Sequence, residues 1–146
     1  MIAVDVADEK LALATSLGAA AALDAGTSDV VRELRRRGGV HVALVTSAAK
    51  AAYDTAFRCL RAAGTLLVVG LPAENLCFPP IMMAAGEVRI RASAVGTRRE
   101  LREVLALADA GKLRCEVATL PLSEVNRALQ ELDHGQVTGR VVLTLS

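Results

Sequence analysis

Aromatic side chains are almost absent from this sequence of 146 residues, which has no tryptophan, one tyrosine and two phenylalanines. Proteins that bind nucleic acids combine clustered positive charge with aromatic rings on which bases stack. Here 17 Lys and Arg are balanced by 16 Asp and Glu, so that the formal net charge is only +1. We therefore expect no nucleic-acid partner.

A long apolar run is also lacking. Crossing a membrane as a helix takes about 20 consecutive apolar residues, and no run in this sequence approaches that length. Residues 1–20 carry acidic groups from Asp5 onward and show neither a basic leader nor a cleavage pattern. We expect a cytoplasmic protein that has no membrane partner.

Cysteine and histidine are too sparse to predict a metal centre or a disulfide framework. The three cysteines, Cys59, Cys77 and Cys115, are an odd number at wide spacing. The two histidines, His41 and His134, have no second ligand at the short spacing of metal motifs. We expect no metal site within the chain. Because free cysteine is among the most buried residue types, we expect three buried, reduced thiols.

Hydrophobic residues make up 53% of the sequence and follow an alternating pattern. Short β-branched runs alternate with segments whose apolar residues recur at three- and four-residue spacing. The expected strands are residues 2–6, a short piece around Leu23, and residues 40–45, 65–69, 88–94, 116–120 and 140–145. The expected helices are residues 8–17, 28–37, 48–62, 98–110 and 123–133. This order predicts an α/β fold with a parallel sheet, in one domain over residues 1–146.

Capping residues agree with these boundaries. Hydroxyl side chains stand where helices are expected to begin, at Ser28, Ser47, Thr97 and Ser123. Glycines stand where helices are expected to stop, at Gly38, Gly64, Gly111 and Gly135. Residues 72–86 contain three prolines, so we expect an irregular crossing with one turn of helix there.

Asp5, near the end of the first expected strand, is the sharpest local signal for a ligand. In a dinucleotide-binding fold, a carboxylate at the end of the second strand accepts hydrogen bonds from the adenosine ribose and would repel a 2′-phosphate. Asp5 therefore favours NAD over NADP. Lys10 could reach the same ribose or its phosphate. The alternative is that Asp5 only starts a helix and that Lys10 is a solvated side chain.

Four segments together carry a family resemblance: VDVADEKLALATSLGA, GGVHVALVTSAAKAAYDTAFRCLRAAGTLLVVGLP, SAVGTRRELREVLALADAGK and GQVTGRVVLTL. In this order they resemble the bacterial NAD-dependent, zinc-containing alcohol dehydrogenases of the medium-chain dehydrogenase family. The match corresponds to the C-terminal part of the cofactor-binding domain. It implies an oxidoreductase fragment with a Rossmann-like, doubly wound parallel sheet. It also implies NAD as cofactor and, in the full-length family, zinc and a small alcohol or aldehyde.

The resemblance also implies that the sheet is incomplete. In that family the cofactor domain opens with a strand, a glycine-rich turn and a helix, whereas this sequence begins at the second strand and has no GxGxxG. The main phosphate cradle and the catalytic zinc domain would then be missing, and we expect no catalytic residue in this chain. Without its central first strand, the sheet must either pair residues 2–6 with residues 40–45 or leave two unpaired apolar edges.

Positions that match the family imply a cofactor site. Asp5 and Lys10 would lie at the adenosine ribose, and Arg140 at the pyrophosphate. Val45 and Thr46 would line the nicotinamide side of the cleft. The nicotinamide carboxamide would meet the backbone of Val69, Gly70 and Leu71 and the strand-end pair Ser93 and Val95. Each has a simpler alternative. The valines suit the core of any parallel sheet, and Gly70 suits an ordinary turn.

Three functions remain open from the sequence. The first is a partial NAD-binding domain of an alcohol dehydrogenase, inactive alone. The second is one half of a split dehydrogenase, whose other half is a separate chain. The third is an oligomerisation module that has lost cofactor binding. Residues 88–94 motivate the third, because relatives continue the sheet across a subunit interface at this edge, which predicts a homo-oligomer.

Overall fold

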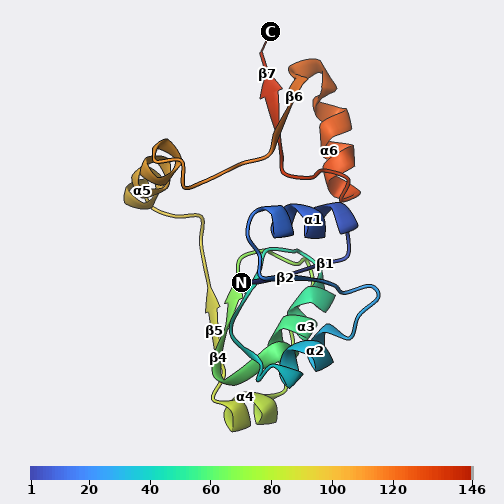
Figure 1. The fold of residues 1–146 in the computed structure, drawn as a ribbon, viewed down its shortest axis with the longest axis vertical. Coiled ribbons are helices and arrows are strands. Elements are labelled where there is room, and N and C mark those ends of the chain that lie inside the picture. The colour runs from blue at the N-terminus through green and yellow to red at the C-terminus, as the bar shows by residue number, and fades with distance from the viewer. Residues whose placement is uncertain (146) are drawn as a thin grey trace.

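Strands and helices alternate along the chain in the computed structural model, which describes residues 1–145 (Figure 1). The strands are β1 (Ile2–Asp5), β2 (Ala21–Asp24), β3 (Val40–Val45), β4 (Leu60–Val68), β5 (Arg89–Ala92), β6 (Val117–Pro121) and β7 (Arg140–Thr144). The helices are α1 (Asp8–Ser16), α2 (Val30–Arg36), α3 (Lys50–Cys59), α4 (Pro80–Gly86), α5 (Arg98–Asp109) and α6 (Val125–Asp133), with a 3-10 turn η1 (Leu122–Glu124) before α6. The predicted order of elements is confirmed.

Every strand pair is parallel, which confirms the α/β class. The strands form three separate sheets, β1–β2, β3–β4–β5 and β6–β7. Within residues 1–145, no hydrogen-bonded ladder joins β1 to β3. In the doubly wound order, that is the place of the central first strand. Of the two expected outcomes, the structure therefore has the unpaired edges.

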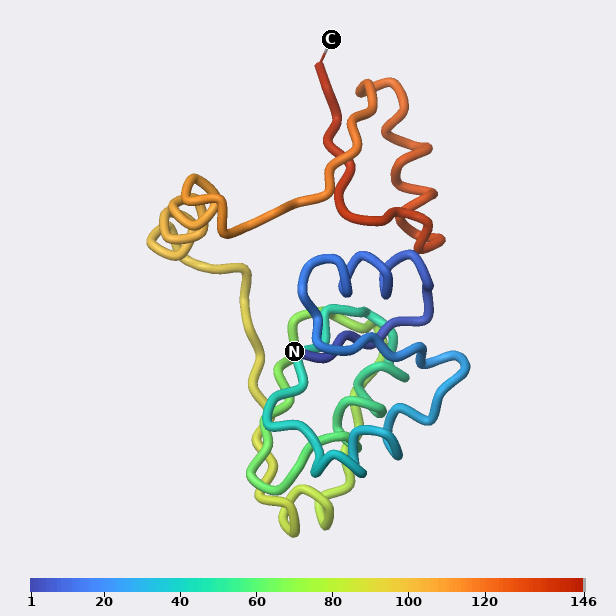
Figure 2. Tube along the Cα trace, in the orientation of Figure 1, coloured from blue at the N-terminus to red at the C-terminus, as the bar shows by residue number. Residues whose placement is uncertain are grey.

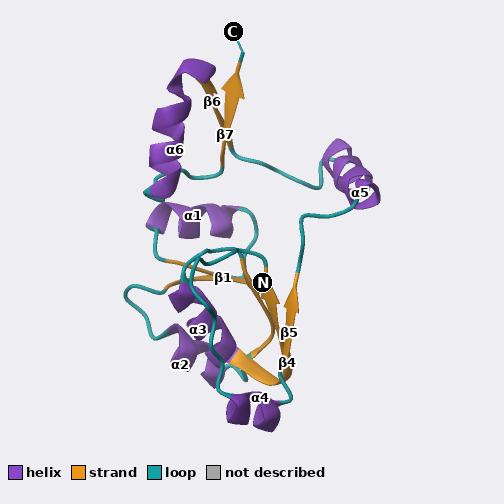
Figure 3. Ribbon diagram, turned by 180° about the vertical axis from the view of Figure 1, so that it is seen from behind, coloured by secondary structure: helices purple, strands orange, loops and turns teal. Residues whose placement is uncertain are grey.

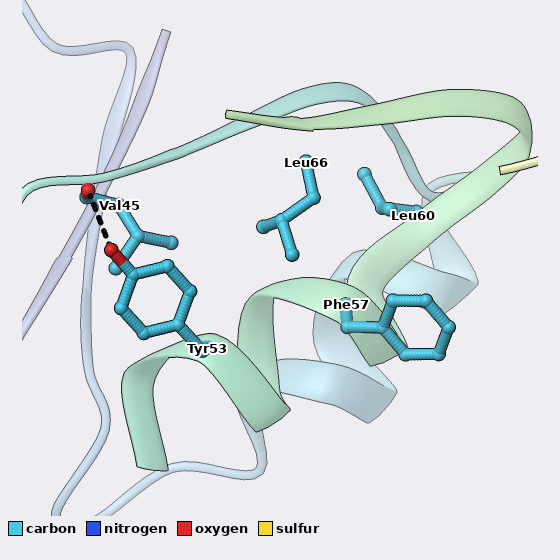
Figure 4. Close-up of a cluster of buried hydrophobic side chains, with 5 residues drawn as sticks. All are labelled: Val45, Tyr53, Phe57, Leu60 and Leu66. Atoms are coloured by element: carbon cyan, nitrogen blue, oxygen red, sulfur yellow. Dashed lines mark hydrogen bonds between the residues drawn. The ribbon is translucent and has the colours of Figure 1, made fainter. Parts of the chain in front are cut away.

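The main core lies between α3 and one face of β3 and β4. Its buried side chains are Val45, Tyr53, Phe57, Leu60 and Leu66 (Figure 4). Two of them, Tyr53 and Phe57, come from one face of α3 because four residues separate them along the helix. Burial of each large apolar side chain stabilises the fold by about 1.5–3 kcal/mol.

A second cluster attaches the β1–β2 pair to the larger sheet. Val30 and Leu34 of α2 are buried against Cys59, and Ile2 of β1 and Leu23 of β2 pack against them. Helices α2 and α3 lie side by side in both ribbon views (Figures 1 and 3). Side-chain packing, rather than strand pairing, therefore connects the first two sheets.

The C-terminal third of the described chain stands apart from this core. Helix α5 has no buried residue, and the trace from β5 through α5 to β6 runs outward (Figure 2). The β6–α6–β7 unit approaches the rest of the chain at α1, where the Thr138 hydroxyl lies 3.3 Å from a Glu9 carboxylate oxygen. Only one residue of this unit, Ala128, is buried among those described.

Several predicted boundaries need correction. Helix α3 ends at Cys59 rather than at residue 62, because Leu60 already pairs with Val40 in β4. Gly64 therefore lies inside β4 and does not stop a helix, and β4 begins well before residue 65. The preceding Ala63 has a left-handed backbone with φ 57°, next to an irregularity of the ladder. No hydrophobic pattern distinguishes such a bulged strand start from a helix end.

The predicted N-caps are confirmed only at Thr97. Thr97 and Glu100 form a reciprocal capping box at the start of α5. The predicted caps at Ser28, Ser47 and Ser123 are wrong. Helix α2 is capped by the Asp29 carboxylate, which accepts from the Arg32 N–H, whereas Ala49 and Glu124 occupy the other two positions without a side-chain cap.

The expectation of three buried thiols is wrong for two of them. Cys59 is buried, whereas Cys77 and Cys115 are exposed. Each of the two exposed cysteines lies in an irregular segment, Cys77 before α4 and Cys115 after α5. Burial raises the pKa of the Cys59 thiol, because the thiolate would lose its hydration.

Candidate functional site

The carboxyl ends of β3 and β4 are hydrogen-bonded to each other, so that residues 45–47 and 69–71 form one platform. The Val45 carbonyl oxygen accepts from the Val69 N–H at 3.1 Å and from the Gly70 N–H at 2.9 Å. The Ser93 N–H, just after β5, donates to the Val68 carbonyl at 2.9 Å. In doubly wound folds, ligands bind outside the carboxyl ends of the strands, so this edge is the candidate site.

Gly70 allows two segments to approach more closely than side chains permit. A Cβ atom on Gly70 would overlap the Ser47 carbonyl oxygen and lie 2.6 Å from the Thr46 carbonyl oxygen. These are backbone atoms, so a larger residue would have to displace the chain. This close contact explains the glycine better than turn chemistry alone does.

The platform is supported from below by Tyr53. The Tyr53 ring is fully buried, and its hydroxyl donates to the Gly70 carbonyl and lies 3.5 Å from the Val45 carbonyl oxygen (Figure 4). Sequence reasoning missed this residue, because a single tyrosine on an apolar helix face is indistinguishable from an ordinary core residue. The polar hydroxyl was the available signal, since a buried hydroxyl requires a partner.

The residues predicted around the nicotinamide do come together at this edge, with one exception. Val45 is buried beneath the platform, whereas Thr46, Val69 and Leu71 are exposed on it. Val95 is fully exposed and lies beyond the end of β5.

Asp5 lies at the carboxyl end of β1, as predicted. One carboxylate oxygen, Oδ1, accepts from the N–H groups of Val6 and Ala7 at 2.8 and 3.1 Å, so that it holds the turn into α1. No hydrogen bond within residues 1–145 uses the other oxygen, Oδ2. Asp5 therefore holds the turn before α1 but does not cap the helix, whose N-cap Ala7 has no side-chain cap, and Oδ2 still offers an acceptor.

A second carboxylate, which sequence reasoning did not single out, is paired with Asp5 in register. Asp24 ends β2 opposite Asp5. Its oxygens accept from the Gly26 N–H and the Thr27 hydroxyl, each at 2.7 Å. The Thr27 and Gly26 hydrogen bonds lower the pKa of the Asp24 carboxyl. Asp24 therefore stays ionised within its own turn, next to the acidic end of β1.

Lys10 and Arg140 lie at another surface. The Lys10 Nζ is 3.9 Å from the Cβ position of Gly135, so it faces the loop before β7. The Arg140 guanidinium donates to the adjacent Gly139 carbonyl at 3.0 Å. No side-chain hydrogen bond within residues 1–145 joins Lys10 or Arg140 to the platform.

Metal ligands are not clustered in the described part of the chain. Within residues 1–145, no group of three or more His, Cys, Asp and Glu side chains could hold a metal ion. Nor does any helix in this range have the length and apolar character needed to cross a membrane.

The model for zinc-binding dehydrogenases matches residues 1–110. The chain belongs to the zinc-binding dehydrogenase family. The match ends directly after α5, where the separate β6–α6–β7 unit follows.

Curated relatives and solved structures agree with this assignment. The chain is 38% identical over 145 residues to an alcohol dehydrogenase of Rhizobium meliloti, covering 99% of this chain and 43% of that protein. It is also 38% identical over 144 residues to an alcohol dehydrogenase of Geobacillus stearothermophilus, covering 98% of this chain and 43% of that protein. The chain therefore spans less than half the length of these relatives.

Among solved structures, an alcohol dehydrogenase from Aeropyrum pernix superposes with a TM-score of 0.92 at 42% identity, covering 97% of this chain and 42% of that chain. An alcohol dehydrogenase zinc-binding domain protein from Burkholderia ambifaria superposes with a TM-score of 0.85 at 28% identity, covering 98% of this chain and 41% of that chain. The predicted family resemblance and the Rossmann-like parallel fold are thus confirmed.

Proposed function

We propose that this chain is the NAD-binding portion of an alcohol dehydrogenase that transfers hydride between a primary or secondary alcohol, or the corresponding aldehyde, and NAD. The observation that carries the proposal is the platform where β3 and β4 end, with Gly70 pressed against the backbone of residues 46–47. Gly70 is half-buried and the adjoining Leu71 is exposed, which suits the close approach of a flat ring and its carboxamide to the backbone. Family membership over residues 1–110 supports the same function.

The chain's own part in the reaction is to bind and orient the cofactor. When bound, NAD supplies the acceptor for hydride. Thr46 and the backbone of residues 69–71 would position the nicotinamide, and Ser93 would approach its carboxamide from the next strand. Asp5 Oδ2 would accept a hydrogen bond from the adenosine ribose.

Zinc does not fit the described residues, since they hold no cluster of metal ligands. No catalytic step is therefore assigned to this chain, and we expect it to be inactive by itself. We assign the alcohol-binding and metal-binding residues to the part of the relatives' length that this chain does not cover, which is more than half. We also propose that the protein is cytoplasmic.

The test is a calorimetric titration of the chain with NAD, compared with its Gly70→Ala variant. We expect saturable binding by the native chain and weaker binding by the variant, because the added methyl group displaces the platform. NADH formation from an added alcohol should stay at background in both. Absence of NAD binding at millimolar cofactor, or equal binding by the two chains, would refute the proposal.

A second candidate, self-association through β5, is favoured by one observation. Within residues 1–145, β5 pairs with β4 on one side and with no strand on the other, and all residues of β5 are exposed. An exposed edge strand can extend the sheet into a second copy. Sedimentation of the chain with and without Ile90→Lys tests this candidate, and an unchanged distribution of species would exclude the β5 edge.

A further inference from the structure

The Tyr53 hydroxyl has no packing role that a phenyl ring would lack. Its ring lies in the main core beside Phe57 and Leu66, where a phenylalanine would fill the same space (Figure 4). A buried hydroxyl costs free energy unless it is hydrogen-bonded, and this one is bonded to the platform backbone at Gly70. The role of the hydroxyl therefore lies in its hydrogen bond to the platform backbone and not in the packing of the core.

The hydrogen bond fixes the orientation of one peptide unit. In a trans peptide, the carbonyl oxygen of one residue and the N–H of the next point in opposite directions. Holding the Gly70 carbonyl toward the buried Tyr53 hydroxyl therefore directs the Leu71 N–H away from the core. Leu71 is 81% exposed, and no hydrogen bond within residues 1–145 uses its N–H.

Glycine makes this orientation dependent on an outside constraint. Gly70 has no Cβ atom, so its flanking peptide units can rotate at little steric cost. The preceding units are already fixed, because the N–H groups of Val69 and Gly70 both donate to the Val45 carbonyl. The Gly70–Leu71 unit is held by Tyr53.

We propose that Tyr53 is a positioning residue, whose hydroxyl turns the Leu71 N–H outward as a donor for a ligand carbonyl at the carboxyl end of β4. This inference rests on the function proposed above, in which the backbone of residues 69–71 positions the nicotinamide; the ligand carbonyl would then be that of its carboxamide. Tyr53 does not touch the ligand itself.

Orientation can be tested without any ligand. Gly70–Leu71 is the only Gly–Leu pair in the sequence. Labelling glycine with carbonyl-¹³C and leucine with ¹⁵N therefore gives one correlated signal, in solution or by magic-angle spinning. We expect Tyr53→Phe to change the Gly70 carbonyl shift and the dipolar coupling of the Leu71 N–H. Phe57→Leu, in the same helix and core, should leave both unchanged. An unchanged signal in Tyr53→Phe, or an equal change in Phe57→Leu, would overturn the inference.

A second measurement tests the same hydrogen bond if the Tyr53→Phe variant does not fold. Tyr53 is the only tyrosine, so growth with 3-fluorotyrosine modifies this site alone. Fluorination makes the hydroxyl a stronger donor without removing it. The Gly70 carbonyl signal should respond, and a signal that does not respond would overturn the inference.

Binding then tests the role toward the ligand. NAD and ADP-ribose differ by the nicotinamide, so calorimetry with both isolates that end of the cofactor. We expect Tyr53→Phe to weaken NAD binding by up to about tenfold and to leave ADP-ribose binding unchanged. Equal weakening of both ligands would make Tyr53 merely structural. If the native chain binds neither ligand, the proposed function fails, while the labelled Gly–Leu signal still decides whether Tyr53 orients the peptide.

Discussion

At the scale of single residues, Gly70 is a position where one added methyl group should destabilise the fold. We expect Gly70→Ala to lower the free energy of unfolding by about 1–3 kcal/mol, because the Cβ atom meets the backbone of Thr46 and Ser47. Chemical denaturation of the two chains measures this difference.

Gly86→Ala is the matched control. A Cβ atom there meets only a Val88 methyl group, at 3.1 Å, and that side chain can move. The control should stay within about 0.5 kcal/mol of the native chain. If the two variants are equally stable, the backbone contact at Gly70 does not constrain the platform.

Asp5 should set the choice between cofactors. A 2′-phosphate near its free carboxylate oxygen adds repulsion on the order of 1 kcal/mol, so we expect NAD to bind about fivefold more tightly than NADP. Asp5→Asn should remove most of this preference. Asp8→Asn, which changes the net charge equally at an exposed position, should not. Competition titrations with the two cofactors give the ratio, and an unchanged ratio in Asp5→Asn would contradict the assignment.

The family resemblance implied Val45, Gly70 and Ser93 as cofactor-site residues. In the structure they lie at one edge, because parallel strands present their carboxyl ends there. This arrangement does not extend to Lys10, which lies inside α1 rather than at a strand end and faces the loop at Gly135. Tyr53 was missed because the periodicity of a helix reports burial and not the direction of a hydroxyl.

At the scale of elements, α5 owes its start to one capping box. The Glu100 carboxylate accepts from the Thr97 N–H at 2.6 Å, and this backbone hydrogen bond lowers the pKa of the Glu100 carboxyl. A carboxyl group whose pKa is lowered by folding stabilises the folded form above its unfolded pKa, about 4.3. That contribution is lost as the pH falls through the lower, folded value.

We therefore expect amide protection in the first turn of α5 to fall on acidification below about pH 4. Glu100→Gln keeps a capping side chain but cannot titrate, so its protection should depend less on pH. Glu103→Gln, one turn further along, should behave as the native chain does. Hydrogen exchange across this pH range provides the comparison, and a parallel decline in all three chains would show that the box does not control the helix start.

Element order was predictable from alternating periodicity, whereas the division of the strands among three separate sheets was not. β-branched runs at residues 40–45 and 140–145 look alike in sequence, yet one joins the main sheet and the other pairs with β6 in a separate unit. Pairing depends on which partner strand is available nearby, and a hydrophobic pattern carries no such information.

At the scale of the whole molecule, the gap between β1 and β3 should govern behaviour in solution. Val42 and Leu44, on the face of β3 away from the main core, are each 58% exposed. Unpaired edges with apolar side chains template association. We expect residues 1–146 expressed alone to form low-stability oligomers, as judged by sedimentation, and to unfold below about 60 °C.

Adding a strand, glycine-rich turn and helix before residue 1 should restore a single cooperative transition. Val42→Lys should reduce association without that addition, because it places charge on the open face. A monomer with a sharp transition above about 60 °C would mean that the split sheet is stable as it stands.

The packing of α2 against Cys59 allows the β1–β2 pair to separate from the β3–β4–β5 sheet before the rest of the chain unfolds. Because no strand ladder within residues 1–145 joins β1 or β2 to the main sheet, this segment can detach without breaking a ladder, at a lower free energy than global unfolding. Cys59 is covered by that same cluster, whereas Cys77 and Cys115 are open. A thiol reagent should therefore label two sites at once and the third only at the rate of detachment. The rate at which Cys59 is labelled thus measures how fast the β1–β2 pair separates from the main sheet.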